Sequence, residues 1–484
     1  MHEYDRLFIG GDWVRPCGTG KLNVVSPHSL QVVGSVPRAE MADLEQAVSA
    51  AREAFDDGPW PRTPPEERAA AVARFSDVYS KRTAELAGLI TSEVGSPISF
   101  SRLAQGLAPW MMLESFLKAA KEHPWEQDRR GTLGNRIVVL REPVGVVGAI
   151  VPWNMPQFLA MSKLAPALLA GCTVVLKPPP EAALDSMVMA EALSEAALPP
   201  GVVSIVPGGA SLGEALVHHP RVDKIAFTGS TAVGRTIAGA CGAQLKRCTL
   251  ELGGKSAAIV LDDADLDRTA DGLRFASLMN NGQACVAHSR ILAPRSRYGE
   301  VVDAVASMVG SLVVGDPADP ATAVGPLATA AQRQRVERYV QLGGDEGARL
   351  VLGGTGMPEG LERGWYVKPT LFADADNHMT VAREEIFGPV LVVIPYIDDA
   401  DAVRIANDSP YGLAGSVWTE DTARAIDVAK KVRSGTFGIN NYMMDFTAPF
   451  GGYRSSGIGR ELGPEGLDQY VELKSVVTLE SVVS

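Results

Sequence analysis

The sequence predicts an α/β fold built on doubly wound parallel sheets. The first observation is an alternation of short apolar runs with alanine- and leucine-rich segments between residues 144 and 251. The second is a similar alternation that begins after Gly254. Strands that alternate with helices pack as a parallel sheet with helices on both faces. The 484 residues are enough for two or three domains of this kind.

The expected elements follow in chain order. Helical stretches are expected at 42–55 and 66–94, with prolines at 59, 61, 64 and 65 around the break between them. Residues 130–141 are expected to form either an extended arm or an ordinary edge hairpin. The first alternating series has expected strands at 144–150, 173–176, 202–206, 224–227 and 248–251, and helices at 186–198 and 211–218. The second series has expected strands at 257–261, 290–293, 390–395 and 415–418.

Composition argues against several classes of protein. The formal net charge is −12, and no block of Lys and Arg offsets it, so neither nucleic acid nor an anionic membrane is an expected partner. The N-terminus lacks a signal pattern, and no apolar run reaches the length of a membrane span. Five cysteines without CxxC spacing suit free thiols in a reducing cytoplasm and predict no metal site.

Two short segments carry residues suited to thioester chemistry. Glu251 lies in ELGGK at 251–255, and Cys285 lies in NGQACV at 281–286. A cysteine thiolate can attack a carbonyl carbon, and a carboxylate can then activate water. Each residue alone has a plainer interpretation, since Cys is often a small buried apolar residue and Glu is usually solvated. Their combination with the motifs below favours catalysis.

Several polar residues follow the expected strands directly. Asn154, Lys177, Gly229 and Glu251 all lie at or just after strand ends. Ligands of doubly wound sheets bind at the carboxyl ends of the strands, so one shared crevice is expected. The amide of Asn154 can stabilise an oxyanion there, or it can cap the following helix. Lys177 can donate to ribose hydroxyls or be a plain surface lysine.

A phosphate-binding segment is expected at 229–236, GSTAVGRT. It lacks the lysine of a P-loop, with Arg235 in that place, and the chain has no GxGxxG motif. A strand, then Gly229 and Ser230, then a helix beginning near Thr231 would still aim backbone N–H groups at a pyrophosphate. A P-loop phosphotransferase is therefore a remote alternative.

Taken together, the motifs resemble those of NAD(P)-dependent aldehyde dehydrogenases. PWN at 152–154, FTGSTAVG at 227–234, ELGGK, NGQACV and EEIFGPV at 384–390 occur in the family's order. The resemblance runs from FIGGDW near the start to GRELG at 459–463. It implies a Rossmann-like dinucleotide-binding domain at 1–122 and 144–253 and a catalytic domain at 254–453. It also implies an oligomerisation arm and tail at 123–143 and 471–484.

The resemblance also implies roles for individual residues. Catalytic roles fall on Cys285, Glu251, Asn154 and Glu461. Cofactor contacts fall on Ile150, Pro152, Trp153, Lys177, Gly209, Gly213, Phe227, Gly229, Ser230, Gly234, Leu252, Glu385 and Phe387. Substrate contacts fall on Met155, Leu159, Ala284, Val286, Phe446 and Phe450, which can equally be packing residues. Gly209 and Gly213 can also belong to a tight turn, and Glu385 can be a solvated turn residue.

The implied activity is oxidation of an aldehyde to the carboxylic acid through a thiohemiacetal and a thioester, with hydride transfer to NAD(P)+. The expected cofactor is NAD, with NADP possible because Pro180 stands where the family often has a ribose-binding glutamate. The apolar pocket residues favour an uncharged aliphatic or aromatic aldehyde. A homodimer or homotetramer is implied. The alternatives are a CoA-acylating enzyme, which the presence of Glu251 disfavours, and a non-catalytic scaffold protein.

Overall fold

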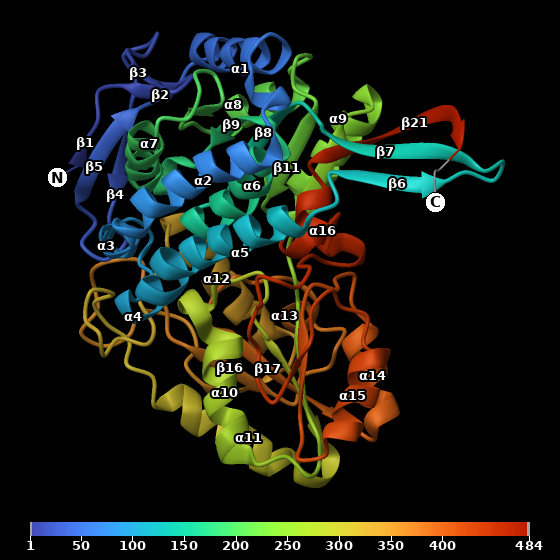
Figure 1. The fold of residues 1–484 in the computed structure, drawn as a ribbon. Coiled ribbons are helices and arrows are strands. Elements are labelled where there is room, and N and C mark those ends of the chain that lie inside the picture. The colour runs from blue at the N-terminus through green and yellow to red at the C-terminus, as the bar shows by residue number, and fades with distance from the viewer. Residues whose placement is uncertain (1, 482–484) are drawn as a thin grey trace.

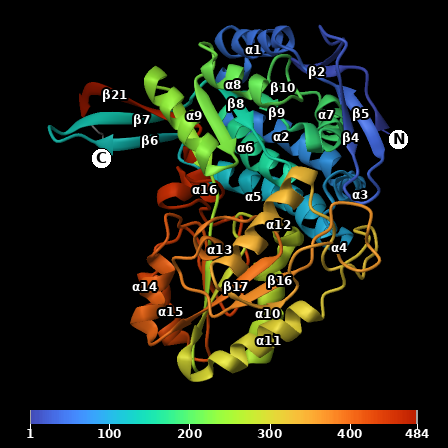
Figure 2. The ribbon, with the colours of Figure 1, turned by 180° about the vertical axis from the view of Figure 1, so that it is seen from behind.

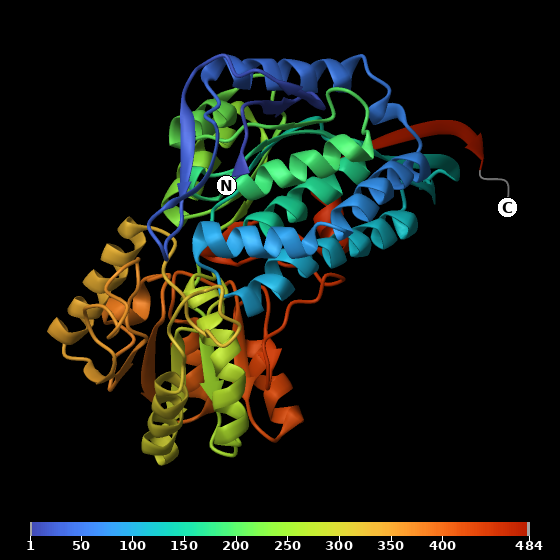
Figure 3. The same cartoon turned by 90° about the vertical axis from the view of Figure 1, so that its left-hand side faces the viewer.

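The computed structural model describes residues 2–481, which form two α/β lobes and a projecting arm. Figure 1 shows the N-terminal lobe above, the second lobe below, and the arm extending to one side. Figure 3, turned by 90°, shows the two lobes meeting along one boundary. The expected α/β architecture is confirmed, and each alternating segment of the sequence builds its own sheet.

The upper lobe is organised around an eight-stranded sheet. Its order is β20 (Gly457–Ile458), β12 (Arg247–Glu251), β11 (Lys224–Thr228), β8 (Val146–Ile150), β9 (Thr173–Lys177), β10 (Val203–Ile205), β2 (Leu7–Ile9) and β3 (Asp12–Val14). The five central strands run parallel, and β20, β2 and β3 add antiparallel edges. The chain proceeds from β8 through β9 to β10 on one side, then returns to place β11 and β12 on the other. The strand order therefore reverses between β8 and β11, which is where such sheets bind ligands.

Helices cover both faces of this sheet. They are α1 (Met41–Asp56), α2 (Pro65–Ser80), α3 (Thr83–Val94), α4 (Ile98–Phe100), α5 (Ala108–Glu122), α6 (Pro156–Ala170), α7 (Leu184–Ala196), α8 (Ala210–His218), α9 (Thr231–Gln244) and α16 (Gly463–Asp468). All fifteen residues of α6 are buried, so this helix forms the centre of the lobe. Two apolar clusters fill the space on either side of the sheet.

Two expectations for the N-terminal segment were wrong or incomplete. A single helix over 66–94 is not observed, because the chain breaks between α2 and α3 at Lys81 and Arg82. Arg82 is the N-cap of α3, and its Nη1 donates to Glu191 Oε2 of α7 at 2.7 Å. The short strands β1 (His2–Glu3), β4 (Lys21–Val25) and β5 (Val32–Pro37) form a separate sheet that the sequence pattern did not reveal.

The second lobe contains a seven-stranded sheet. Its order is β15 (Arg349–Leu352), β16 (Thr370–Ala373), β17 (Val390–Tyr396), β14 (Arg290–Pro294), β13 (Ala257–Val260), β18 (Gly415–Trp418) and β19 (Gly438–Ile439). The helices of this lobe are α10 (Leu266–Leu278), α11 (Tyr298–Gly310), α12 (Ala330–Asp345), α13 (Thr380–Arg383), α14 (Asp399–Asn407) and α15 (Thr422–Lys431). Only β15 runs antiparallel to its neighbour, so this lobe too is a wound parallel sheet.

The arm is a three-stranded antiparallel sheet. A hairpin of β6 (Glu126–Arg130) and β7 (Asn135–Pro143) pairs with β21 (Val471–Ser481) from the end of the chain. Figures 1 and 2 both show it projecting away from the lobes. The expected extended segment is therefore present and is itself part of a hairpin. The domain boundaries and the oligomerisation role remain predictions. Within the described residues, no helix is long and apolar enough to cross a membrane.

Candidate active site

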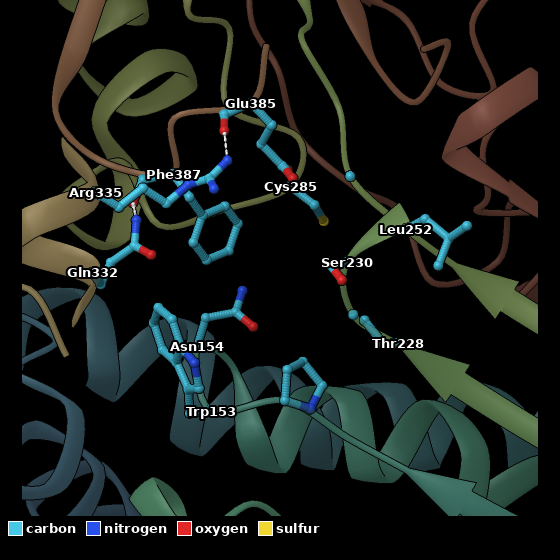
Figure 4. A pocket seen from close by; sticks show the side chains of 13 residues that line it. Trp153, Asn154, Thr228, Ser230, Leu252, Cys285, Gln332, Arg335, Glu385 and Phe387 are labelled. Carbon is cyan, nitrogen blue, oxygen red and sulfur yellow. Dashed lines mark hydrogen bonds between the residues drawn. The ribbon is translucent and has the colours of Figure 1, made fainter. Parts of the chain in front are cut away.

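A cleft lies between the two lobes, at the point where the strand order reverses. Its volume is about 280 Å³. Three segments that follow strands β8, β11 and β12 form one wall, and residues of the second lobe form the other (Figure 4). The lining residues are Pro152, Trp153, Asn154, Thr228, Gly229, Ser230, Leu252, Gly253, Cys285, Gln332, Arg335, Glu385 and Phe387. Nine of these thirteen are residues that the sequence assigned to the site.

Cys285 reaches the cleft on a loop held in an unusual conformation. Asn280, Asn281 and Gly282 have φ values of 51°, 62° and 72°, all in the left-handed region. The side chain of Asn281 fixes this turn, because its Nδ2 donates to the carbonyl oxygens of Gly95 and Pro326, both at 2.9 Å. The asparagines of the NNGQAC segment therefore hold strained backbone that aims the cysteine.

The thiol of Cys285 is held in its protonated form. Burial raises the pKa of Cys285 far above its usual value, and the carboxylates of Glu385 and Glu251 raise it further. A resting thiolate is therefore not supported. The sulfur needs a base that removes its proton as the reaction begins.

Asn154 faces Cys285 across the cleft, as Figure 4 shows. The side-chain Nδ2 of Asn154 donates to the backbone carbonyl oxygen of Gln283 at 3.1 Å. The backbone carbonyl oxygen of Asn154 accepts from Gln105 Nε2 at 2.9 Å and from Asn280 Nδ2 at 2.8 Å. The alternative role of Asn154 as a helix cap is wrong, because α6 has Met155 as its N-cap and no side-chain cap. The Asn154 side chain is thereby held at the wall of the cleft, and its oxyanion role remains a prediction.

Glu251 ends strand β12 and is almost fully buried, at 2% exposure. Neither of its carboxyl oxygens has a hydrogen-bond partner within the described part of the chain. Burial raises the pKa of Glu251 well above its usual range, and the charge of Glu461 adds to this effect. A carboxylate of raised pKa is a stronger base than an ordinary one once it is ionised, which suits a general base.

Glu461 belongs to a buried ion pair that the sequence did not reveal. Lys163 of α6 donates to Glu461 Oε1 at 2.6 Å and to Thr228 Oγ1 at 2.7 Å, while Ser162 Oγ donates to Glu461 Oε2 at 2.8 Å. Lys163 is fully buried, and its charge acts on Glu251. A lysine inside an otherwise apolar helix, PQFLAMSKLAPALLA, was the available signal.

The segment after β11 forms the expected cradle. Ser230 is the N-cap of α9, and its Oγ accepts from the Val233 amide at 3.4 Å. The close approach of α9 to the sheet requires glycine, because a Cβ on Gly234 would lie 2.4 Å from Leu252 Cδ2. Arg235 is exposed and donates to Ser455 Oγ at 3.1 Å, so it does not replace a P-loop lysine.

Lys177 is buried at the end of β9, so its interpretation as a plain surface lysine is wrong. Its Nζ donates to the carbonyl oxygens of Pro178 at 3.0 Å and Gly208 at 2.8 Å. Burial lowers the pKa of Lys177 to about 8. A Cβ on Gly213 would lie 3.5 Å from the Lys177 side chain, whereas Gly209 begins α8 beside open space. Ile150 and Phe227 pack in the core beneath the cleft.

Glu385 and Phe387 form the opposite wall of the cleft. Glu385 Oε1 accepts from the Gly254 amide at 3.1 Å, and a Cβ on Gly253 would lie 2.3 Å from Oε2. Burial raises the pKa of Glu385 to about 7. The interpretation of Glu385 as a solvated turn residue is therefore wrong. The Phe387 ring packs edge-on against Trp153, with centroids 5.6 Å apart.

Gln332 and Arg335 of α12 were missed because no motif marks their helix. Arg335 Nη2 donates to the Glu385 carbonyl oxygen at 2.6 Å, and Gln332 Nε2 donates to the Phe387 carbonyl oxygen at 2.7 Å (Figure 4). Together they fix the backbone that presents the Glu385 carboxylate and the Phe387 ring. Their spacing of three residues on a helix is common on any exposed helical face, so it gave no signal.

The six expected substrate residues lie near the cysteine but do not line this cleft. Five are buried, and all six pack in the apolar cluster that also contacts Cys285. Phe446 lies 6.1 Å from the Phe158 ring. The substrate role of Met155, Leu159, Ala284, Val286, Phe446 and Phe450 remains a prediction.

Comparison with known proteins agrees with this geometry. A model of the "Aldehyde dehydrogenase family" matches residues 13–476. The chain belongs to this family. Among its relatives, this family member is 49% identical over 477 residues to a geranial dehydrogenase of Castellaniella defragrans, covering 99% of both chains. It is 42% identical to a 3-succinoylsemialdehyde-pyridine dehydrogenase of a Pseudomonas species, covering 99% of this chain and 100% of that one.

Solved structures of similar proteins include complexes with a dinucleotide. An aldehyde dehydrogenase of Mycobacterium tuberculosis complexed with NAD+ superposes with a TM-score of 0.97 at 51% identity, over 100% of this chain and 99% of that one. A mutant of aldehyde dehydrogenase C from Pseudomonas syringae, complexed with NAD+ and octanal, gives a TM-score of 0.94 at 40% identity. That match covers 98% of this chain and 96% of the other.

Proposed function

We propose that this family member oxidises an uncharged aliphatic or aromatic aldehyde to its carboxylic acid, with NAD+ as hydride acceptor. The observation that carries the proposal is the placement of Cys285 and Asn154 on facing walls of a cleft, with Glu251 buried directly before the lining residues Leu252 and Gly253. A nucleophile and an oxyanion donor thereby face one space, and a buried base ends the strand that leads to it.

The residues present fit a bound dinucleotide. Gly229 and Ser230 begin α9 and would aim backbone N–H groups at its phosphates. The Glu385 carboxylate is a hydrogen-bond acceptor suited to ribose hydroxyls. It needs glycine at position 253, because a Cβ there would lie 2.3 Å from Glu385 Oε2. The rings of Trp153 and Phe387 provide apolar walls. When bound, NAD+ supplies the acceptor for the hydride that leaves the aldehyde carbon.

Cys285 begins the reaction by losing its proton to a base and forming a bond from Sγ to the aldehyde carbon. The oxygen of the resulting thiohemiacetal gains negative charge, which Asn154 Nδ2 and the Cys285 backbone N–H would stabilise. Loss of the hydride from the same carbon leaves an acyl group on the sulfur as a thioester. In the first step the Cys285 proton passes to water in the cleft, so the first turnover does not require Glu251.

Glu251 acts when the thioester is hydrolysed. It takes a proton from a water molecule as the water oxygen attacks the acyl carbon, and the C–S bond then breaks to release the acid and free the cysteine. Lys163 and Glu461 adjoin Glu251 and are the groups that can take this proton onward. This gives Glu461 a role in proton transfer.

Three alternatives make separate predictions. A CoA-acylating enzyme would release an acyl-CoA rather than a free acid, and the buried base Glu251 favours hydrolysis. A non-catalytic scaffold would not need a strained loop that aims a cysteine into a cleft. A phosphotransferase is disfavoured because Arg235 is turned to the surface. NADP as a second cofactor remains possible, since Pro180 can neither accept from a ribose hydroxyl nor repel a phosphate.

The deciding experiment is a panel of aldehydes assayed with each nicotinamide cofactor, with product analysis. The two relatives described above act, by name, on unlike aldehydes, so the panel should span aliphatic, terpenoid, aromatic and carboxylate-bearing substrates. Free acid formation with NAD+ is expected. Cys285→Ala should abolish oxidation, while Glu251→Gln should retain a first-turnover burst of reduced cofactor. A full steady-state rate in either variant contradicts the assigned roles.

We further infer a homodimer or homotetramer and a cytoplasmic location. The arm supports the first inference, because Leu473, Val476 and Val477 on β21 are exposed at a sheet edge. The second is supported by the cysteines, all five of which are unpaired, as expected in a reducing compartment.

A further inference from the structure

One face of strands β11 and β12 carries a row of polar side chains that leads away from the cleft. Thr228 pairs with Glu251 at the cleft end, and Lys224 pairs with Arg247 at the far end. Thr249 lies between Glu251 and Arg247 on β12. Paired residues of parallel strands point to the same side, and alternate residues of a strand share a face. All five side chains therefore lie on the face that also contacts Lys163.

Lys224 is the unexplained member of this row. It is 1% exposed, its Nζ donates to Thr249 Oγ1 at 2.6 Å, and it lies 5.0 Å from the centre of the Tyr470 ring. No acidic side chain is within ion-pair distance of it among the described residues. A buried lysine without a counter-charge is costly, which points to a use beyond packing.

Lys224 also borders a second cavity. This cavity has a volume of about 590 Å³ and lies at the root of the arm. Lys224 lines it together with Arg247, Asp468 and Gln469. It is on the opposite end of the strands from the catalytic cleft, because β11 and β12 reach the cleft with their carboxyl ends. The polar row thus leads from the catalytic base towards a second route to solvent, with no direct hydrogen bond from Glu251 to Thr249 among the described residues.

Two glycines border the gap between Glu251 and Thr249. A Cβ on Gly451 would lie 2.6 Å from Glu251 Oε1 and 3.0 Å from the Gly459 carbonyl oxygen. A Cβ on Gly459 would lie 3.4 Å from Thr249 Oγ1 and 2.9 Å from Gln469 Oε1. The positions of residues 249 and 251 along the strand differ by about 7 Å, a span that bridging water can cover.

A second exit matters because of when the protons appear. Each turnover converts an aldehyde and water into an acid, and the protons released must leave the site. During thioester hydrolysis the cleft holds an acyl group and a dinucleotide, so Glu251 cannot exchange freely with solvent on that side. This step rests on the proposed function.

We propose that protons accepted by Glu251 leave through the Lys163–Glu461 pair and then through Thr249 and Lys224 into the cavity at the root of the arm. An O–H bond of the hydrolytic water breaks as Glu251 takes the proton. At the far end, an N–H bond of Lys224 breaks as cavity water takes its proton, and Lys224 is reprotonated through the Thr249 hydroxyl. Only protons move, so nothing is oxidised or reduced.

The charges around Lys224 suit such exchange. Burial lowers the pKa of Lys224 to about 8, so its ammonium can lose and regain a proton near neutral pH. The groups that face it from the neighbouring elements are Cys248 and Arg247 on β12, Cys172 before β9, Glu461 after β20, and Tyr470 after α16. Of these, the two cysteines and Glu461 favour the ammonium, and Arg247 opposes it.

The test uses the full-length protein with NAD+ and the best aldehyde of the panel. Lys224→Met removes the exchanging group, and Lys224→Arg keeps the charge above Tyr470 but cannot release a proton. Thr249→Val is a nearly isosteric second variant. Lys246→Met is the matched control, since Lys246 is a partly buried lysine beside the same strands whose Nζ donates to the Val217 and His219 carbonyl oxygens, off the row.

Both Lys224 variants are expected to lower kcat about tenfold near pH 7, less than loss of a base at the reacting atoms costs. The first-turnover burst and the KM for aldehyde should be unchanged, the solvent deuterium isotope effect on kcat should rise, and millimolar methylamine should restore the rate. Thr249→Val should lower kcat in the same way, and Lys246→Met should not. A fully active Lys224→Arg variant, or a loss of kcat that methylamine does not restore, contradicts proton exit through Lys224. A wild-type protein that forms no acid instead overturns the proposed function.

Discussion

The Cα of Gly254 lies directly against the backbone of Cys285: a Cβ at position 254 would be 2.4 Å from the Cys285 carbonyl oxygen. Contacts that short do not occur between real atoms, and the opposing group is backbone rather than a flexible side chain. The second glycine of ELGGK is therefore required by the position of the nucleophile. The ELGGK and NGQACV segments therefore touch each other in the fold.

Gly254→Ala is expected to displace the Cys285 loop and lower kcat/KM about 100-fold, because errors of about 1 Å in a reacting geometry have that effect. Steady-state oxidation of aldehyde measures it, and reaction of Cys285 with a thiol reagent reports whether the loop has moved. Gly344→Ala is the control, since a Cβ at position 344 meets nothing within 4 Å. Equal activity of the two variants would show that the loop tolerates the added methyl group.

Part of the site could be predicted because several of its residues lie at the end of a strand with a recognisable pattern. Asn154, Gly229 and Glu251 follow apolar runs, and the parallel sheet brings such ends together. Lys163, Gln332 and Arg335 could not be predicted in this way. They lie within helices, and only tertiary packing turns their side chains toward Glu461, Phe387 and Glu385.

The secondary structure also divides into elements that the sequence predicts and elements that it does not. Long alternating segments gave the central strands within one or two residues, since period and length distinguish them from helices. The strands before residue 40 have two to six residues and little apolar pattern, so pairing with distant strands defines them. At the break between α2 and α3, Arg82 contacts Glu191, which is far away in sequence.

Lys163→Met is expected to destabilise the protein by about 3–5 kcal/mol, because it leaves the buried carboxylate of Glu461 without its partner. Urea denaturation measures this loss. Thioester hydrolysis should also slow, while the first-turnover burst persists.

The double variant Lys163→Met with Glu461→Leu separates the two effects. Apolar residues of similar size can replace a buried ion pair with little loss of stability. The double variant should therefore regain most of the free energy of unfolding but remain slow in turnover. Recovery of the steady-state rate together with stability would mean that the pair is only structural.

Glu385 predicts a pH dependence of cofactor binding. Its pKa is raised to about 7 by burial, against the opposing effects of the Gly254 amide and Arg335. Only the carboxylate can accept two hydrogen bonds from ribose hydroxyls, so the KM for NAD+ should fall as the pH rises from 6 to 8. Glu385→Gln should weaken NAD+ binding and remove this pH dependence, which binding titrations without aldehyde would show.

The same shift makes a prediction about stability, with the opposite trend. The pKa of Glu385 is higher in the folded than in the unfolded state, so folding favours the protonated form. Its contribution is fully present below about pH 4.5 and is lost as the pH rises through about 7, by roughly 3 kcal/mol at most. The unfolding free energy of Glu385→Gln should change less than that of wild type across this range. A parallel pH profile for both proteins would contradict the shift.

The arm predicts how the oligomer can be dissociated. Strand β21 is an edge of its sheet, and Leu473 and Val477 on it are 65% and 64% exposed. An exposed apolar edge strand is a site for pairing with another chain, so we expect it to be covered in the assembled protein.

Leu473→Glu combined with Val477→Glu should yield a smaller species in light scattering or sedimentation, because two charges per chain would have to be buried. Ile397→Glu is the control, since Ile397 is 70% exposed between β17 and α14 of the second lobe. If wild type is already a monomer at micromolar concentration, or if the control dissociates as readily, the arm is not the contact that joins the subunits.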